Sequence, residues 1–237
     1  MTEALYHSDS YLKQTKAQVV GINDDGGVVL DRTIFYPGGG GQPPDQGKLL
    51  WSGYVGRVER VKKSGSDIVH YAAGPTPQVG QFVNCKVDWE RRYQLMRTHT
   101  ALHILCGVIW RDLQAHVTGG NMEPGTGRLD FELESISADF AQMIEERLNA
   151  EVAACRPINV KVLARAEAFE IPDLIRTKIN LLPEGIDLVR TVEIVGLDLQ
   201  ADGGTHVANT QEVGTIRVVE HKSKGKTNKR IRIALTT

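Results

Sequence analysis

Two histidines in the middle of the chain have the spacing of metal ligands. His99 and His103 stand four residues apart, and at that spacing on a helix the Cβ atoms lie about 5 to 6 Å from each other, close enough for both imidazoles to reach one ion. Thr100 occupies the position where HExxH proteases carry the glutamate that acts as general base, which argues against a peptidase. The pair alone also fits two unrelated histidines, one packed inside and one on the surface.

A second group of ligand types occurs much later in the chain. Asp202 and His206 are four residues apart in the sequence Asp-Gly-Gly-Thr-His, whose glycines let the backbone fold tightly around an ion. With the two helical histidines they make a nitrogen and oxygen donor set that suits Zn²⁺. Four protein ligands leave no open position for water or substrate, so Asp202 is either a weak ligand or an outer partner that orients a histidine.

The three cysteines add little to this set. Cys106 shares a helical face with His99 and His103 and is a further candidate ligand, but a buried core cysteine is the favoured interpretation. Cys85 and Cys155 lie far from it in sequence. Three widely spaced cysteines exclude a disulfide framework and a CxxC metal or redox motif.

A glycine-rich segment near the N-terminus is the third feature that can bind a ligand. Its four successive glycines are Gly38, Gly39, Gly40 and Gly41. Such a backbone can be approached closely and exposes N–H groups to carbonyl or phosphate oxygens. It is not a P-loop, because no Gly-Lys-Ser or Gly-Lys-Thr follows. The alternative is a flexible loop between strands.

The elements that carry these motifs change in type near residue 88. Before it, short runs rich in β-branched residues lie at residues 17–20, 27–30, 54–58 and 81–87. The Asn-Asp-Asp-Gly sequence at residues 23–26 indicates a hairpin turn, so this region is expected to be a small barrel or sandwich of strands. Asp88 can cap a helix running from residue 89 to about 113, because apolar residues recur there at helical spacing. These are Leu95, Leu102, Cys106 and Ile109.

Beyond this helix the pattern mixes strands with a second helix. Strands are expected at residues 128–133, 158–163, 188–195, 213–219 and 231–235. Ser137 can cap a helix that ends before Pro157, and a basic loop at residues 221–229 is expected to join the last two strands. The chain is therefore expected to be α+β, with a β-barrel or sandwich domain at residues 1–88 and, at residues 89–237, helices packed on an antiparallel sheet.

Composition narrows the class of protein. The 237 residues are 41% hydrophobic and 24% charged, which argues against a disordered, fibrous or coiled-coil chain. The longest apolar stretch, residues 101–110, is well short of the ~20 residues of a membrane span. With no legible targeting segment at the N-terminus, a cytoplasmic protein is expected.

Positive charge gathers at the C-terminal end. Residues 221–237 hold six basic residues and no acidic one, although the formal net charge of the chain is only -1. The basic positions are Lys222, Lys224, Lys226, Lys229, Arg230 and Arg232. This segment is either a solvated face or a contact for a phosphate backbone, for which Lys222 to Arg230 are the candidates.

Taken together, the three motifs make the sequence resemble the alanyl-tRNA editing family, the free-standing relatives of the editing domain of alanyl-tRNA synthetase. The resemblance covers nearly the whole chain, and the glycine-rich segment points to the two-domain form. It implies that His99, His103, Asp202 and His206 hold Zn²⁺, with Asp202 standing where the family has cysteine. A carboxylate is a harder ligand than a thiolate, so zinc affinity and metal identity depend on this substitution.

The same resemblance implies an activity and a fold. It predicts an elongation-factor-like barrel, then an editing domain that removes a wrongly attached amino acid from tRNA-Ala, chiefly the seryl ester and, as a second candidate, the glycyl ester. Thr118 is expected to contact the serine hydroxyl, because an apolar pocket discriminates poorly against one added hydroxyl; the alternative is a turn residue. Zinc is expected either to activate water or to position the amino acid. Two other functions fit: a non-catalytic tRNA-binding module with a decayed metal site, and a metal-dependent hydrolase of small esters or amides.

Overall fold

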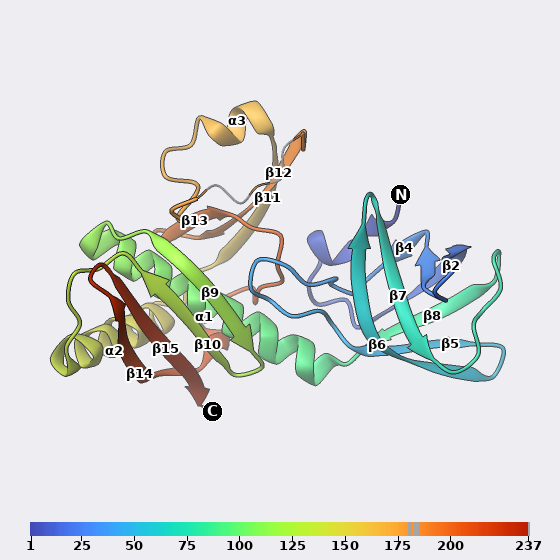
Figure 1. The fold of residues 1–237 in the computed structure, drawn as a ribbon, viewed down its shortest axis with the longest axis horizontal. Coiled ribbons are helices and arrows are strands. Elements are labelled where there is room, and N and C mark those ends of the chain that lie inside the picture. The colour runs from blue at the N-terminus through green and yellow to red at the C-terminus, as the bar shows by residue number, and fades with distance from the viewer. Residues whose placement is uncertain (180–181, 183–184, 237) are drawn as a thin grey trace. The chain divides into compact units, whose positions relative to one another are not determined.

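The computed structural model describes residues 1–179, 182 and 185–236 (Figure 1). The chain forms two compact units, Met1–Gln94 and Leu95–Thr237. Both contain antiparallel sheets, and the α+β class expected from the sequence is confirmed. Within the described residues, no helix combines the length and the apolar character that a membrane crossing requires.

The first unit is a closed six-stranded barrel, one of the two forms that the strand pattern allows and the one that the family resemblance implies. Its strands follow the order β2-β3-β7-β6-β5-β8, and all neighbours pair antiparallel. Their bounds are β2 (Gln14–Ile22), β3 (Val28–Leu30), β5 (Gly47–Trp51), β6 (Tyr54–Ser64), β7 (Asp67–Ala73) and β8 (Phe82–Val87). A short 3₁₀ turn (Leu5–His7) and the parallel pair β1 (Glu3–Ala4) and β4 (Arg32–Thr33) complete the unit.

Alternating side chains close the barrel around an apolar core. In β8 the inward positions Val83, Cys85 and Val87 are buried while the residues between them are exposed, the period of two that a half-buried strand requires. Leu30 and Leu49 are fully buried in the same core. Removing these side chains from water is the main favourable term for this unit.

The helix α1 (Trp89–Leu113) has the bounds that the sequence predicts. It begins after Asp88, whose Oδ1 accepts the N–H of Arg91 at 3.2 Å. Every residue from 95 to 109 is buried, so the expected stripe is only one side of a helix that the second unit surrounds. Residues 99 and 103 therefore lie inside the unit, where their polar groups require partners.

A four-stranded sheet packs on α1 in the second unit. Its order is β14-β15-β10-β9. The strands are β9 (Val117–Glu123), β10 (Thr126–Phe131), β14 (Thr215–Gly225) and β15 (Asn228–Thr236). Gly127 lets β10 approach the helix, because a Cβ at that position would lie 3.0 Å from the Leu102 side chain. The helix α2 (Ala138–Ala153) contacts β14 and begins after Ser137, whose Oγ accepts the N–H of Phe140 as the sequence predicts.

The remaining elements of the second unit include a three-stranded antiparallel sheet. Its strands are β11 (Ile158–Ala164), β12 (Leu188–Ile194) and β13 (Asp198–Ala201), in that order. The short helix α3 (Arg165–Phe169) follows β11, and a 3₁₀ turn (Thr210–Val213) precedes β14. This turn explains why the strand expected from residue 213 begins at residue 215.

The expectation of a basic loop at residues 221–229 is wrong. Here β14 continues to Gly225 and β15 starts at Asn228, so the segment is a hairpin with a tight turn. Cross-strand hydrogen bonds and packing on the sheet outweigh the low strand propensity of its lysines and glycine.

Candidate metal centre

Four side chains from two distant parts of the chain meet inside the second unit. His99 and His103 come from α1, and Asp202 and His206 come from the segment that follows β13. One donor atom from each lies within 4.8 Å of the others. The ring centroids of His99 and His206 are 4.2 Å apart, and those of His103 and His206 are 4.7 Å apart. The structure thus brings together the two pairs singled out in the sequence.

Asp202 faces two of the imidazoles. Its Oδ2 lies 3.0 Å from Nε2 of His206, and its Oδ1 lies 3.6 Å from Nε2 of His99. The N–H of Gly204 donates to Oδ2 at 2.7 Å, as expected for a carboxylate in a glycine turn. Arg190 of β12 donates from Nη1 to the Asp202 carbonyl oxygen at 2.9 Å. The Gly204 bond fixes the carboxylate in the cluster, and the Arg190 bond fixes the backbone that carries it.

The ring of His206 is held from its other side. Its Nδ1 lies 3.1 Å from Oγ1 of Thr100, which also accepts the N–H of Val207 at 3.3 Å. Thr100 is completely buried. The residue that replaces the glutamate of the protease motif therefore orients a histidine from a different part of the chain.

His103 has an acidic partner that sequence reasoning missed. Its Nδ1 lies 3.2 Å from Oδ2 of Asp198, the first residue of β13, in an ion-pair contact whose alignment falls short of a hydrogen bond. The signal available in the sequence is weak: an acid four residues before Asp202, in a segment rich in polar residues.

Burial and charge set the protonation of the four groups. Burial lowers the pKa of His206 to about 4 and holds the pKa of His99 well below its ordinary value. Burial opposes ionisation of Asp202, but the facing histidines outweigh it and hold the pKa of that carboxyl well below its usual range. Burial also acts to lower the pKa of His103, yet Asp198 and Asp202 raise it overall.

This donor set fits a metal ion. Metal binding requires neutral imidazoles and ionised carboxylates, the states that the environment favours for His99, His206 and Asp202. Three nitrogens and one oxygen suit Zn²⁺ among the common protein metals. Cys106 is buried, its pKa is raised well above the ordinary value by burial, and it is not one of the four grouped residues.

The glycine-rich segment forms a defined turn in the first unit. Gly38 to Gly41 all have positive φ angles, between 57° and 133°, which only glycine adopts without strain. Gly39 and Gln42 exchange two backbone hydrogen bonds, and Gly40 and Gly41 are exposed. At the base of the turn, Asp45 Oδ2 accepts the N–H of Tyr36 at 2.7 Å.

The other residues singled out in the sequence lie at the surface or next to it. Thr118 is exposed on β9, and its hydroxyl donates to Oδ1 of Asn228 in β15 at 2.9 Å. Lys222, Lys224 and Lys226 are exposed on the hairpin.

Two basic residues of the hairpin are engaged within the unit. Lys229 is buried and its Nζ donates to the carbonyl oxygens of Gly225 and Lys226 at 2.7 and 2.9 Å, and its expected phosphate contact stays a prediction. Arg230 is half-buried and donates to both carboxylate oxygens of Asp130, at 2.7 and 2.8 Å. The exposed positive charge therefore comes mainly from the three lysines before it.

Comparisons with known proteins match both units. Residues 6–91 match the family model of class II (A) tRNA synthetases, and residues 189–232 match that of the threonyl and alanyl tRNA synthetase second additional domain. The alanyl-tRNA editing protein AlaX-M of Methanosarcina barkeri is 39% identical, with 99% of each chain covered. AlaX-M of Saccharolobus solfataricus is 39% identical with 98% of each chain covered. The alanine–tRNA ligase of Pyrobaculum calidifontis is 37% identical over 100% of this chain and 27% of its own length.

Proposed function

The chain belongs to the alanyl-tRNA editing protein family, and we propose on that basis that it is a trans-editing hydrolase that cleaves the ester of mischarged tRNA-Ala. The observation that carries this proposal is the convergence of His99, His103, Asp202 and His206 inside a unit whose residues 189–232 match a synthetase additional domain. Family membership is the expectation that the three sequence motifs gave, and it is confirmed.

We assign the proposed functions to the two domains expected from the sequence. Residues 1–88 form the barrel domain and residues 89–237 the editing domain, since all four donor residues belong to the latter. The turn at Gly38–Gly41 is proposed to meet tRNA through its exposed backbone. The lysines of the β14–β15 hairpin are proposed to meet the phosphate backbone, since Lys222, Lys224 and Lys226 are exposed.

The four residues would hold Zn²⁺, with Asp202 as a ligand and not an outer partner. An outer partner contacts the ring nitrogen that faces away from the ion, as Thr100 does at Nδ1 of His206. Asp202 contacts Nε2 of the same ring, and Nε2 of His99 as well. The carboxylate is therefore on the side where the ion would bind.

Bound zinc would polarise the ester carbonyl or lower the pKa of a bound water. The protein's own contribution is a buried, fixed set of donors, since His99, His103 and His206 are all buried. The N–H of Gly204 holds the carboxylate of Asp202, Arg190 holds its backbone carbonyl oxygen, and Thr100 holds His206, so the donors stay in place when substrate arrives.

The amino acid removed is proposed to be serine, with glycine as the second candidate. Rejection of alanine requires a polar group that hydrogen-bonds the serine hydroxyl, because a site that pairs a hydroxyl rejects the analogue lacking it far better than an apolar site does. Thr118 is the proposed group. It is exposed, and its hydroxyl would exchange its hydrogen bond to the side chain of Asn228 for one to the serine hydroxyl.

The test is a deacylation assay with the purified, zinc-loaded protein. Seryl-tRNA-Ala should lose its ester well above the buffer rate while alanyl-tRNA-Ala persists, and His103→Ala should abolish the difference. Glu151→Gln is the matched control, because Glu151 is a buried acid of the same unit that pairs with Arg111 and Arg156 and not with the cluster. Salt-sensitive tRNA binding with all esters intact would identify a binding module, and hydrolysis of free seryl esters would identify a small-ester hydrolase; either contradicts the proposal.

A further inference from the structure

We infer that Asp198 is a positioning residue of the metal centre, which fixes the ring of His103 through Nδ1 so that Nε2 is the donor toward the ion. The inference rests on the proposed metal centre and extends it to a residue outside the four donors.

The contact between Asp198 and His103 is buried. The side chain of Asp198 is 0% exposed and that of His103 is 8% exposed, and the Nδ1 to Oδ2 distance is 3.2 Å. A neutral imidazole carries one proton, and the charge of a carboxylate 3.2 Å from Nδ1 attracts that proton to Nδ1, even without the alignment of a full hydrogen bond. The lone pair then lies on Nε2, and the neighbouring negative charge makes it a stronger ligand.

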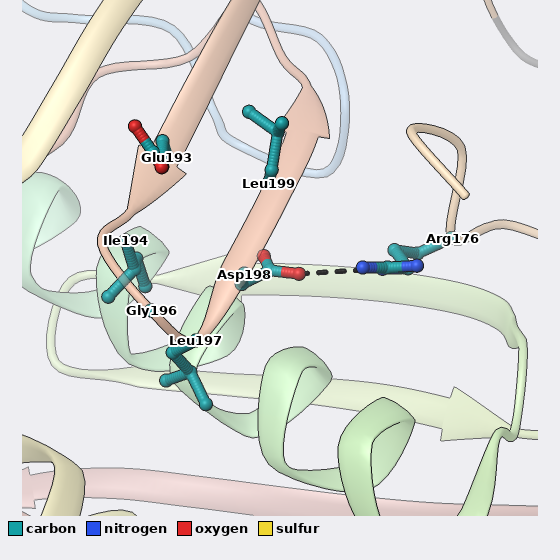
Figure 2. Close-up of a pocket in the computed structure, with 7 residues that line it drawn as sticks. All are labelled: Arg176, Glu193, Ile194, Gly196, Leu197, Asp198 and Leu199. Carbon is teal, nitrogen blue, oxygen red and sulfur yellow. Dashed lines mark hydrogen bonds and ion pairs between the residues drawn. The ribbon is translucent and has the colours of Figure 1, made fainter. Parts of the chain in front are cut away.

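Two residues clamp the Asp198 carboxylate. Gln200 Nε2 donates to its Oδ2 at 2.6 Å, and Arg176 Nε lies 3.5 Å from its Oδ1. Figure 2 shows the ion pair of Arg176 and Asp198, both of which line a cavity of about 240 Å³. The guanidinium of Arg176 also lies over the ring of Trp110, 4.5 Å from its centroid. The carboxylate is therefore held at both oxygens.

A glycine on α1 makes the approach of β13 possible. Gly107 lies four residues after His103 on the same helical face. A Cβ on Gly107 would lie 2.9 Å from Cβ of Asp198 and 2.9 Å from Cγ of Leu197, which is too close for real atoms. Helix and strand can meet here only without that methyl group, and the meeting brings Asp198 to His103.

Asp198 differs in charge from Thr100, the residue that contacts His206 in a similar way. Thr100 presents a neutral hydroxyl to His206, whereas Asp198 presents a full charge to His103. A charged partner raises the basicity of its histidine more than a hydroxyl does. Of His103 and His206, His103 is therefore expected to depend more on its outer partner for metal binding.

The experiment measures metal affinity in the absence of tRNA. Apo forms of the full chain, as wild type, Asp198→Asn, Asp198→Ala, Gly107→Ala and Glu151→Gln, are titrated with Zn²⁺ in competition with a chromophoric chelator. The visible absorption of the Co²⁺-substituted proteins is recorded as a measure of ligand geometry, and far-ultraviolet circular dichroism checks folding. Gly107→Ala keeps the carboxylate but displaces it, and as a helix substitution it would otherwise be favourable.

Both Asp198 variants and Gly107→Ala are expected to bind Zn²⁺ about 10- to 100-fold more weakly and to show an altered Co²⁺ spectrum, with Glu151→Gln unchanged in both. Wild-type affinity in folded Asp198→Ala would overturn the inference, as would an equal loss in Glu151→Gln. Absence of zinc binding by the wild type would overturn the metal centre with it. Weakened binding in the variants of a protein that deacylates no tRNA would leave the inference standing and contradict only the proposed function.

Discussion

Asp202 Oδ2 lies 3.0 Å from Nε2 of His206, on the opposite side of the ring from the nitrogen that another partner holds. A carboxylate in that place is on the side of the imidazole that the proposed ion would occupy. The cluster is thus a three-histidine, one-carboxylate set in which the oxygen donor is supplied by a glycine turn. This relationship leads to the first prediction.

Replacing Asp202 by cysteine should preserve the metal centre and change its preference. A thiolate is softer than a carboxylate, so Asp202→Cys is expected to retain Zn²⁺ and to bind Cd²⁺ more tightly relative to Zn²⁺ than the wild type does. Competition titrations with both ions measure the ratio, with Asp202→Ala as the variant that loses a donor altogether. An unchanged ratio in Asp202→Cys, or full zinc affinity in Asp202→Ala, would show that the carboxylate is not a ligand.

Removing the Thr100 hydroxyl should weaken both the fold and the metal site. Thr100→Val leaves Nδ1 of His206 without its partner, at a cost of about 1–3 kcal/mol in unfolding free energy, and is expected to lower zinc affinity about 10- to 100-fold. Thr33→Val is the control, because Thr33 in the barrel makes the same kind of bond to His70 at 2.8 Å. The control should lose comparable stability and no zinc affinity; equal zinc affinity in both variants would contradict the role of Thr100.

Acid should destabilise the protein through His70. Burial lowers the pKa of His70 to about 4 from 6.5, so below pH 6.5 the unfolded chain binds a proton that the folded chain does not. The contribution of His70 is therefore complete above pH 6.5 and is lost as the pH falls toward 4, amounting to about 2 kcal/mol between pH 7.5 and 5. Urea unfolding of wild type and His70→Gln at both pH values should show a smaller pH effect in the variant by that amount. An equal pH effect in both proteins would rule out this residue as the source.

The buried ion pair below the glycine turn should be costly to break on one side. Arg92 and Asp45 are almost completely buried and hydrogen-bonded to each other. Asp45→Ala leaves an unpaired buried guanidinium and is expected to cost about 3–5 kcal/mol of stability. The double variant Asp45→Asn with Arg92→Met should recover part of that loss, because neither charge is then buried alone. Thermal and urea unfolding measure the stability of both variants. A double variant that is no more stable than Asp45→Ala would contradict the ion-pair argument.

Neutralising the three exposed hairpin lysines should weaken tRNA binding in a salt-dependent way. Lys222→Gln, Lys224→Gln and Lys226→Gln together should reduce the slope of log affinity against log salt by about 2 to 3 if each lysine meets one phosphate. Filter binding at several salt concentrations measures the slope. The deacylation rate at saturating tRNA should be unchanged, since these residues are not in the metal centre; an unchanged slope would place the tRNA contact elsewhere.

Local sequence determined the elements with strong periodicity and clear caps. The helix from Trp89 to Leu113 and the one after Ser137 form where the pattern places them, because capping and helical spacing act within a few turns. The strand β9 was not predicted, since Gly119 and Gly120 interrupt its sequence; it forms because it pairs with β10. The basic hairpin was missed for the same reason.

In the candidate site, too, the sequence predicted the residues with a local pattern and missed those that act through long-range contacts. The donor residues were recognisable because each pair has a fixed spacing of four. Asp198 and Thr100 contact histidines that are far away in sequence, and no local pattern reports such a contact. The burial of Lys229 likewise depends on how a hairpin turn folds back on its own carbonyl oxygens.

The central claim is that one metal ion is held by two pairs of side chains from distant parts of the chain. Elemental analysis of the purified protein after zinc loading and gel filtration tests it directly, alongside His99→Ala and His206→Ala, which remove one member of each pair. The account predicts one zinc per wild-type chain and a large loss in both variants. A zinc content in the wild type no higher than that of the buffer, or full zinc occupancy after either substitution, would contradict the central claim.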